Sequence, residues 1–139
     1  MHKMVTPVSH HEALIYAMVT LSAADRTMTD HELMKIGDIV RTLPVFAEFD
    51  TDRLVATAEA CGALLQGDAG LETVLSIIAA SLPERLYDTA YALAVEVAAA
   101  DLHVEQEELR FLQILRDRFD LDKLTVAAVE RGARARYRT

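Results

Sequence analysis

One eighteen-residue segment occurs twice in this chain, and the duplication constrains the fold more than any other feature. Residues 19–36 read VTLSAADRTMTDHELMKI, and residues 95–112 read VEVAAADLHVEQEELRFL. Each copy is an alanine-rich apolar run that ends in an aspartate, with a glutamate seven positions later. Asp25 and Glu32 therefore correspond to Asp101 and Glu108. Two acidic helix–loop–helix units predict a carboxylate site with twofold character, which favours cation binding over covalent catalysis.

The spacing of the apolar residues predicts an all-α fold. Apolar positions recur with helical periodicity almost throughout, and the alternation typical of strands is absent. Thr29 and Glu32 fit a capping box at a helix start, and Pro44 and Pro83 mark helix boundaries. We expect roughly seven helices, at about 10–24, 29–43, 51–65, 71–81, 83–100, 105–119 and from 122 onward. The offset of the repeat pairs the first two helices with the fifth and sixth, so we expect a bundle with a pseudo-twofold axis.

Length and charge narrow the classes of function. A chain of 139 residues is most simply one domain spanning 1–139. Its formal net charge of −8 argues against nucleic-acid binding, which requires a clustered basic surface. No apolar run approaches the roughly 20 residues of a transmembrane helix, and residues 1–9 do not resemble a secretory signal. We expect a cytoplasmic protein, in agreement with the single cysteine.

The four acidic residues have two interpretations. Asp25 ends one helix and Glu32 lies in the first turn of the next, so a tight loop directs both toward one corner, and Asp101 and Glu108 would form a second pair. Carboxylates are hard oxygen ligands, which suit Ca²⁺, Mg²⁺ or Mn²⁺. Alternatively, the glutamates are capping-box partners and the aspartates accept bonds from loop amides, with no metal involved.

The duplicated pattern resembles the TerB-like family, named for tellurite resistance. The resemblance rests on Ala23-Ala24-Asp25, Met28 and Glu32, and on Ala99-Ala100-Asp101, Val104 and Glu108. It implies a helical bundle with an acidic, metal-associated site formed by Asp25, Glu32, Asp101 and Glu108, and a role in tellurite resistance and stress responses. This chain departs from the family pattern at Arg26 and Leu102, where glycine usually follows each aspartate.

The remaining sequence features have structural explanations or leave their role open. Lys35 occupies the second ligand position of an H-E-x-x-H motif, which excludes that zinc site. Cys61 shares a helical face with Leu54 and Ala58, which indicates a small core residue. The chain ends in a basic run that either complements the C-terminal end of a last helix or faces an anionic partner. The members of this run are Arg131, Arg134, Arg136 and Arg138.

We therefore expect a non-enzymatic, stress-related domain that binds a divalent cation weakly and has a protein partner. The alternative is a protein–protein interaction module whose Asp and Glu residues are only helix caps. The sequence does not specify the oligomeric state.

Overall fold

The computed structural model describes residues 5–24, 28–101 and 104–139. Within these ranges the fold is all-α, with seven α-helices and no strands. The helices are α1 (His10–Ser22), α2 (Asp30–Thr42), α3 (Leu54–Leu65), α4 (Gly70–Ser81), α5 (Tyr87–Ala100), α6 (Gln106–Arg118) and α7 (Lys123–Arg136). This confirms the predicted fold class. The pseudo-twofold relation between the two copies of the repeat stays a prediction.

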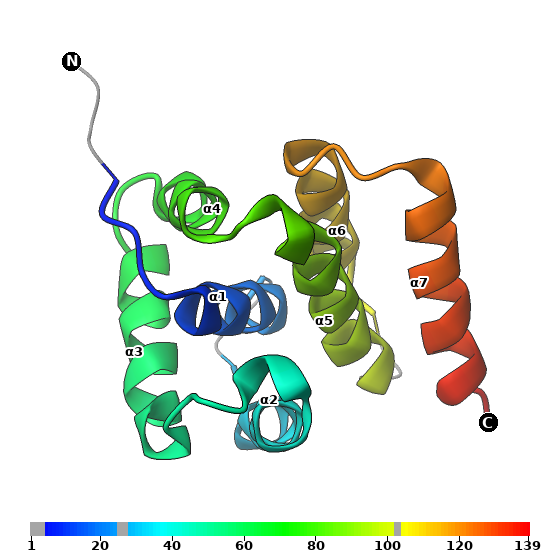
Figure 1. The fold of residues 1–139 in the computed structure, drawn as a ribbon, viewed down its shortest axis with the longest axis horizontal. Coiled ribbons are helices and arrows are strands. Elements are labelled where there is room, and N and C mark those ends of the chain that lie inside the picture. Colours follow the sequence, from blue (N-terminus) through cyan, green and yellow to red (C-terminus); the bar gives the residue numbers. More distant parts are fainter. Residues whose placement is uncertain (1–4, 25–27, 102–103) are drawn as a thin grey trace.

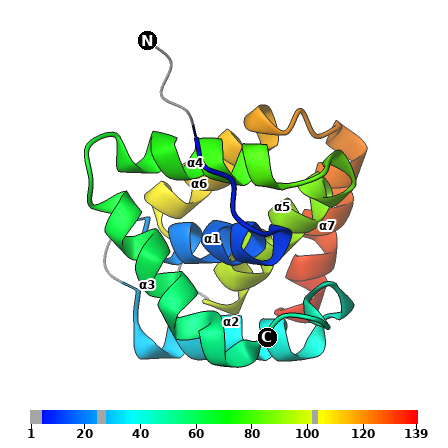
Figure 2. The same cartoon turned by 60° about the vertical axis from the view of Figure 1, so that its left-hand side comes forward.

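Helix α1 forms the centre of the bundle. Every residue from Ala13 to Ser22 is buried, because the helix is apolar around most of its circumference. It packs against α2, α3, α4, α5 and α6. Figure 1 shows α3 to the left of α1, α4 above it and α5 to its right, with α7 on the far side of α5; Figure 2 shows the same bundle with α4 again above α1.

The observed helix boundaries differ from the predicted ones by a few residues. Two predicted helices open with a separate 3₁₀ turn, at Thr51–Arg53 before α3 and at Glu84–Leu86 before α5. Such turns are common where a helix start lacks a strong cap, and neither α3 nor α5 has a side-chain cap at its first residue. At α1 the boundary is sharper, since Ser9 and Glu12 form a capping box.

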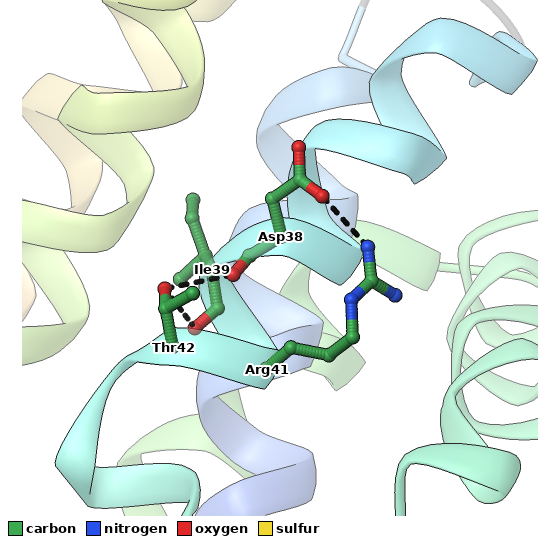
Figure 3. Close-up of polar contacts among 4 residues, drawn as sticks. All are labelled: Asp38, Ile39, Arg41 and Thr42. Atoms are coloured by element: carbon green, nitrogen blue, oxygen red, sulfur yellow. Dashed lines mark hydrogen bonds and ion pairs between the residues drawn. The ribbon is translucent and has the colours of Figure 1, made fainter.

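Two side-chain contacts lie in the last turn of α2, and Pro44 ends the helix. The Thr42 hydroxyl donates to the carbonyl oxygen of Asp38 at 2.8 Å, and Arg41 donates to the Asp38 carboxylate at 2.6 Å (Figure 3). Leu43 then adopts an extended conformation, which a residue before proline favours. The chain therefore leaves the helix one residue before Pro44.

The turn between α3 and α4 is strained and tightly packed. Ala69 has φ 50°, in the left-handed region, where a side chain costs about 1 kcal/mol. A Cβ atom at Gly70 would lie 2.3 Å from the backbone oxygen of Leu65. Glycine is therefore required at position 70 by a close approach of two backbone segments.

Helix α7 is held on α5 and α6 by a small polar network. The hydroxyl of Tyr91, on α5, donates to the carboxylate of Glu130 on α7 and accepts from Arg116 on α6 at 2.9 Å. Burial raises the pKa of Tyr91 to about 12, and the Glu130 carboxylate acts in the same direction. The network thus depends on a neutral tyrosine.

Candidate metal centre

Glu32 lies where the capping-box prediction placed it. It is the third residue of α2, and its Oε1 accepts from the backbone N–H of Thr29 at 2.9 Å. In the reciprocal hydrogen bond, the Thr29 hydroxyl accepts from the backbone N–H of Glu32 at 3.2 Å. The predicted cap is confirmed, and it fixes the buried Glu32 side chain in the otherwise exposed first turn of the helix.

Glu108 occupies the equivalent position in the second copy of the repeat. It is the third residue of α6, and its Oε1 accepts from the backbone N–H of Glu105 at 2.9 Å. The two glutamates therefore make the same bond at the same length. This local similarity agrees with the duplication seen in the sequence.

Asp101 reaches the same region from a third helix. It is the residue that follows α5, and its backbone is extended, with φ −90° and ψ 108°. The side chain is half-buried. Asp25, the corresponding residue of the first copy, lies outside the described residues, as do Arg26 and Leu102.

The three described carboxylates converge on one point. One oxygen each from Glu32, Asp101 and Glu108 lies within 4.8 Å of the other two. Only 7% of Glu32 and 3% of Glu108 is exposed to solvent. At that separation, with an effective dielectric constant of about 20, two carboxylate charges repel each other by about 3 kcal/mol. An arrangement of this kind favours positive charge.

The cap bonds and cation ligation are compatible. A carboxylate has two oxygens and about four lone-pair sites, so a glutamate that accepts one N–H can also ligate a cation. Two ligands of one Ca²⁺ ion, each at about 2.3–2.6 Å, can lie up to about 5 Å apart. The spread of 4.8 Å falls within that reach. Mg²⁺ binds at about 2.0–2.1 Å and would draw its ligands to about 4 Å or less.

All four C-terminal arginines are exposed. One of them, Arg136, forms an ion pair with Glu96 on α5; the others are Arg131, Arg134 and Arg138. Next to Arg136, the hydroxyl of Tyr137 donates to Glu96 and accepts from Lys35 on α2. Sequence reasoning did not identify these partners, because Lys35 and Tyr137 are 102 residues apart.

Cys61 is a core residue, as predicted. Its side chain is fully buried, with Sγ 3.6 Å from the hydroxyl of Thr20 and 3.8 Å from the carbonyl oxygen of Tyr16. Burial raises the pKa of this thiol to about 11, although the contact with Thr20 opposes the rise. The thiol is therefore protonated at neutral pH and has the character of an inert core group.

An apolar groove adjoins the carboxylates. It lies over the second half of α1, between α3 and α6, and has a volume of about 780 Å³. The start of α2 contributes Leu33, the neighbour of Glu32, and α6 contributes Glu107, the neighbour of Glu108. Sequence reasoning missed this groove, because its α3 wall continues the helical periodicity that otherwise indicates a core face.

Of three comparisons with known proteins, one gave a match. No significant match was found among curated proteins or among solved structures. The family described as tellurite resistance protein TerB matches residues 11–131. The matched region runs from α1 into α7 and includes all three converging carboxylates. The chain therefore belongs to the TerB family.

Proposed function

We propose that this domain binds a hard divalent cation and has no enzymatic activity of its own. The observation that carries the proposal is the convergence of Glu32, Asp101 and Glu108 from three different helices, two of them nearly inaccessible to solvent. Asp25 is the fourth ligand on the evidence of the repeat. Membership of the TerB family supports a role in the tellurite and stress response, and domains of this family are generally not enzymes.

The ligand set favours Ca²⁺, Mg²⁺ or Mn²⁺ over softer metals. All of the proposed ligands are carboxylates, and neither histidine nor cysteine belongs to the cluster among the described residues. Four carboxylates fill only part of the coordination sphere of any of these ions, so water completes it. An ion with water ligands and a partly exposed aspartate exchanges readily, in keeping with weak binding.

Calorimetry tests this proposal. Chelator-stripped protein is titrated with Ca²⁺, Mg²⁺, Mn²⁺ and Zn²⁺ in separate experiments. We expect saturable binding of at least one of the first three ions, and its loss in Asp101→Asn. Absence of saturable heat for all three would refute the proposal.

The neighbouring groove supports a second candidate function, the binding of a partner helix. Its α3 wall presents Val55, Ala58, Glu59 and Gly62, at the spacing of one helical face, and Val55 is 52% exposed. Among the described residues that line the groove, the exposed carboxylates of Glu59 and Glu107 outnumber the one cation, Arg110. The fitting partner is an amphipathic helix with bulky apolar residues on one face and lysine or arginine beside them.

Gly62 offers a direct test of the groove. A Cβ atom there meets nothing within 4 Å, so Gly62→Leu adds volume to the groove without a clash at the backbone. The probe is a fluorescent leucine- and lysine-based helical peptide of about the length of α3, followed by anisotropy. We expect binding that Gly62→Leu abolishes and that Ala63→Leu, a control on the exposed adjacent position, leaves intact. Equal binding by both variants would exclude the groove as the site.

The location of the protein stays a proposal as well. Among the described residues, no helix combines the length and the apolar character that a membrane-spanning helix needs. We propose a cytoplasmic location on the basis of the sequence features given above.

A further inference from the structure

A polar cluster at the C-terminus joins the two helices that bear Glu32 and Asp101. Its members are Lys35 on α2, Glu96 on α5, and Arg136 and Tyr137 at the end of α7. The Nζ atom of Lys35 donates to the Tyr137 hydroxyl at 2.8 Å, and this hydroxyl donates to Glu96 Oε1 at 2.8 Å. One hydroxyl group thus links α2 to α5.

Two further contacts support this cluster. Arg136 pairs with the second oxygen of Glu96, and the ammonium group of Lys35 also lies 5.3 Å from the centre of the Tyr137 ring. Burial raises the pKa of Glu96, but the bonds from Arg136 and Tyr137 outweigh it and hold the pKa below its ordinary value. Glu96 is therefore charged at neutral pH, and both of its oxygens have a donor.

The cluster lies close to the candidate metal centre along both helices. Lys35 is three residues after Glu32, and Glu96 is five residues before Asp101. At about 1.5 Å per residue these offsets are about 5 Å and 8 Å along the helix axes. A change in the separation of α2 and α5 at this cluster therefore also changes the separation of Glu32 and Asp101.

We propose that Tyr137 is a positioning residue for the metal centre: it braces α2 against α5 and so sets the spacing of Glu32 and Asp101. The inference rests on the proposed cation-binding function. The brace is supplied by the residue that directly follows α7. Groups that orient metal ligands from outside the coordination sphere commonly change affinity about tenfold or more when they are removed.

Tyr137→Phe tests the brace, because it removes the bridging hydroxyl and keeps the ring. Tyr87→Phe is the matched control, since it removes a tyrosine hydroxyl from α5 outside the cluster, where the Tyr87 ring stacks on Phe119 with the ring centres 4.5 Å apart. We expect the affinity for the best-bound cation, measured by calorimetry well below the melting temperature, to fall roughly tenfold in Tyr137→Phe only. Equal affinities in the two variants would overturn the positioning role.

A second measurement needs no metal. Spin labels are attached through Met34→Cys on α2 and Asp88→Cys on α5, both exposed positions, while the native Cys61 is buried. In the metal-free chain, we expect the distribution of distances between the labels to broaden or shift in Tyr137→Phe and to stay unchanged in Tyr87→Phe. An unchanged distribution in Tyr137→Phe would overturn the brace. A wild-type chain that binds no cation would instead refute the proposed function, and the label distances would still decide whether Tyr137 holds α2 on α5.

Discussion

The replacement Glu32→Gln separates the two roles of this side chain. Glutamine keeps the capping bond at the third position of α2, so the metal-free protein should not lose stability, and the change also removes one charge from a crowded carboxylate cluster. A neutral amide is a much poorer ligand for a hard cation. We therefore expect the variant to fold normally and to lose the stabilisation that a divalent cation gives the wild type.

The size of the effect follows from binding linkage. At a cation concentration of 100 times the dissociation constant, binding to the folded state stabilises it by about 2.7 kcal/mol. A chain of 139 residues unfolds with an entropy of about 0.3 kcal/mol/K, from about 2.1 cal/mol/K per residue. The wild type should therefore melt about 9 °C higher with the cation than without it.

Glu12 provides the control for this experiment. It occupies the same third position in the capping box of α1, with the same reciprocal bonds to Ser9, but is not part of the carboxylate cluster. Melting curves followed by circular dichroism, with cation and with chelator, are compared for the wild type, Glu32→Gln and Glu12→Gln. We expect the cation-dependent shift to vanish only in Glu32→Gln. A shift that survives there, or that disappears equally in Glu12→Gln, would contradict the assignment of Glu32 as a ligand.

Three further predictions concern the fold. Gly70→Ala should lower the free energy of unfolding by about 1–3 kcal/mol in urea titrations, because the new methyl group meets backbone at 2.3 Å, whereas Gly62→Ala should raise it by about 0.5–1 kcal/mol. Folding raises the pKa of Tyr91 from 10.0 to about 12, so the neutral tyrosine stabilises the folded state fully below pH 10. As the pH rises toward 12, the free energy of unfolding should fall by about 2–3 kcal/mol. Tyr91→Phe should reduce this loss of stability at alkaline pH. Cys61 should react with a thiol reagent at neutral pH only on the timescale of unfolding, and rapid labelling of the folded protein would contradict its burial.

The helices could be predicted because their signals are local. Capping residues such as Thr29 and helix breakers such as Pro44 act within one turn, so a single sequence reveals them. The 3₁₀ turns before α3 and α5 were included in the predicted helices, because the sequence has no glycine or proline between either turn and the α-helix that follows it. The strained conformation of Ala69 gives no sequence signal, because alanine disfavours positive φ.

The candidate site was predictable only in part. The repeated interval from aspartate to glutamate identified Glu32, Asp101 and Glu108, and the structure brings these three together. Their convergence depends on how α2, α5 and α6 pack, which a spacing along the chain does not specify. The contact of Lys35 with Tyr137 joins residues that are 102 positions apart, and no local pattern encodes it.

Anomalous diffraction locates a bound ion independently of any change in stability. For a crystal of the protein grown with Mn²⁺, with diffraction recorded at a wavelength where manganese scatters anomalously, we expect one anomalous difference peak bounded by carboxylate oxygens of Glu32, Asp101 and Glu108, with the Asp25 carboxylate or water at the remaining positions. The same crystal form of Glu108→Gln should lack that peak. If calorimetry shows that the protein binds Mn²⁺, a fully ordered structure at saturating Mn²⁺ with no peak among these three carboxylates would refute the proposed metal centre.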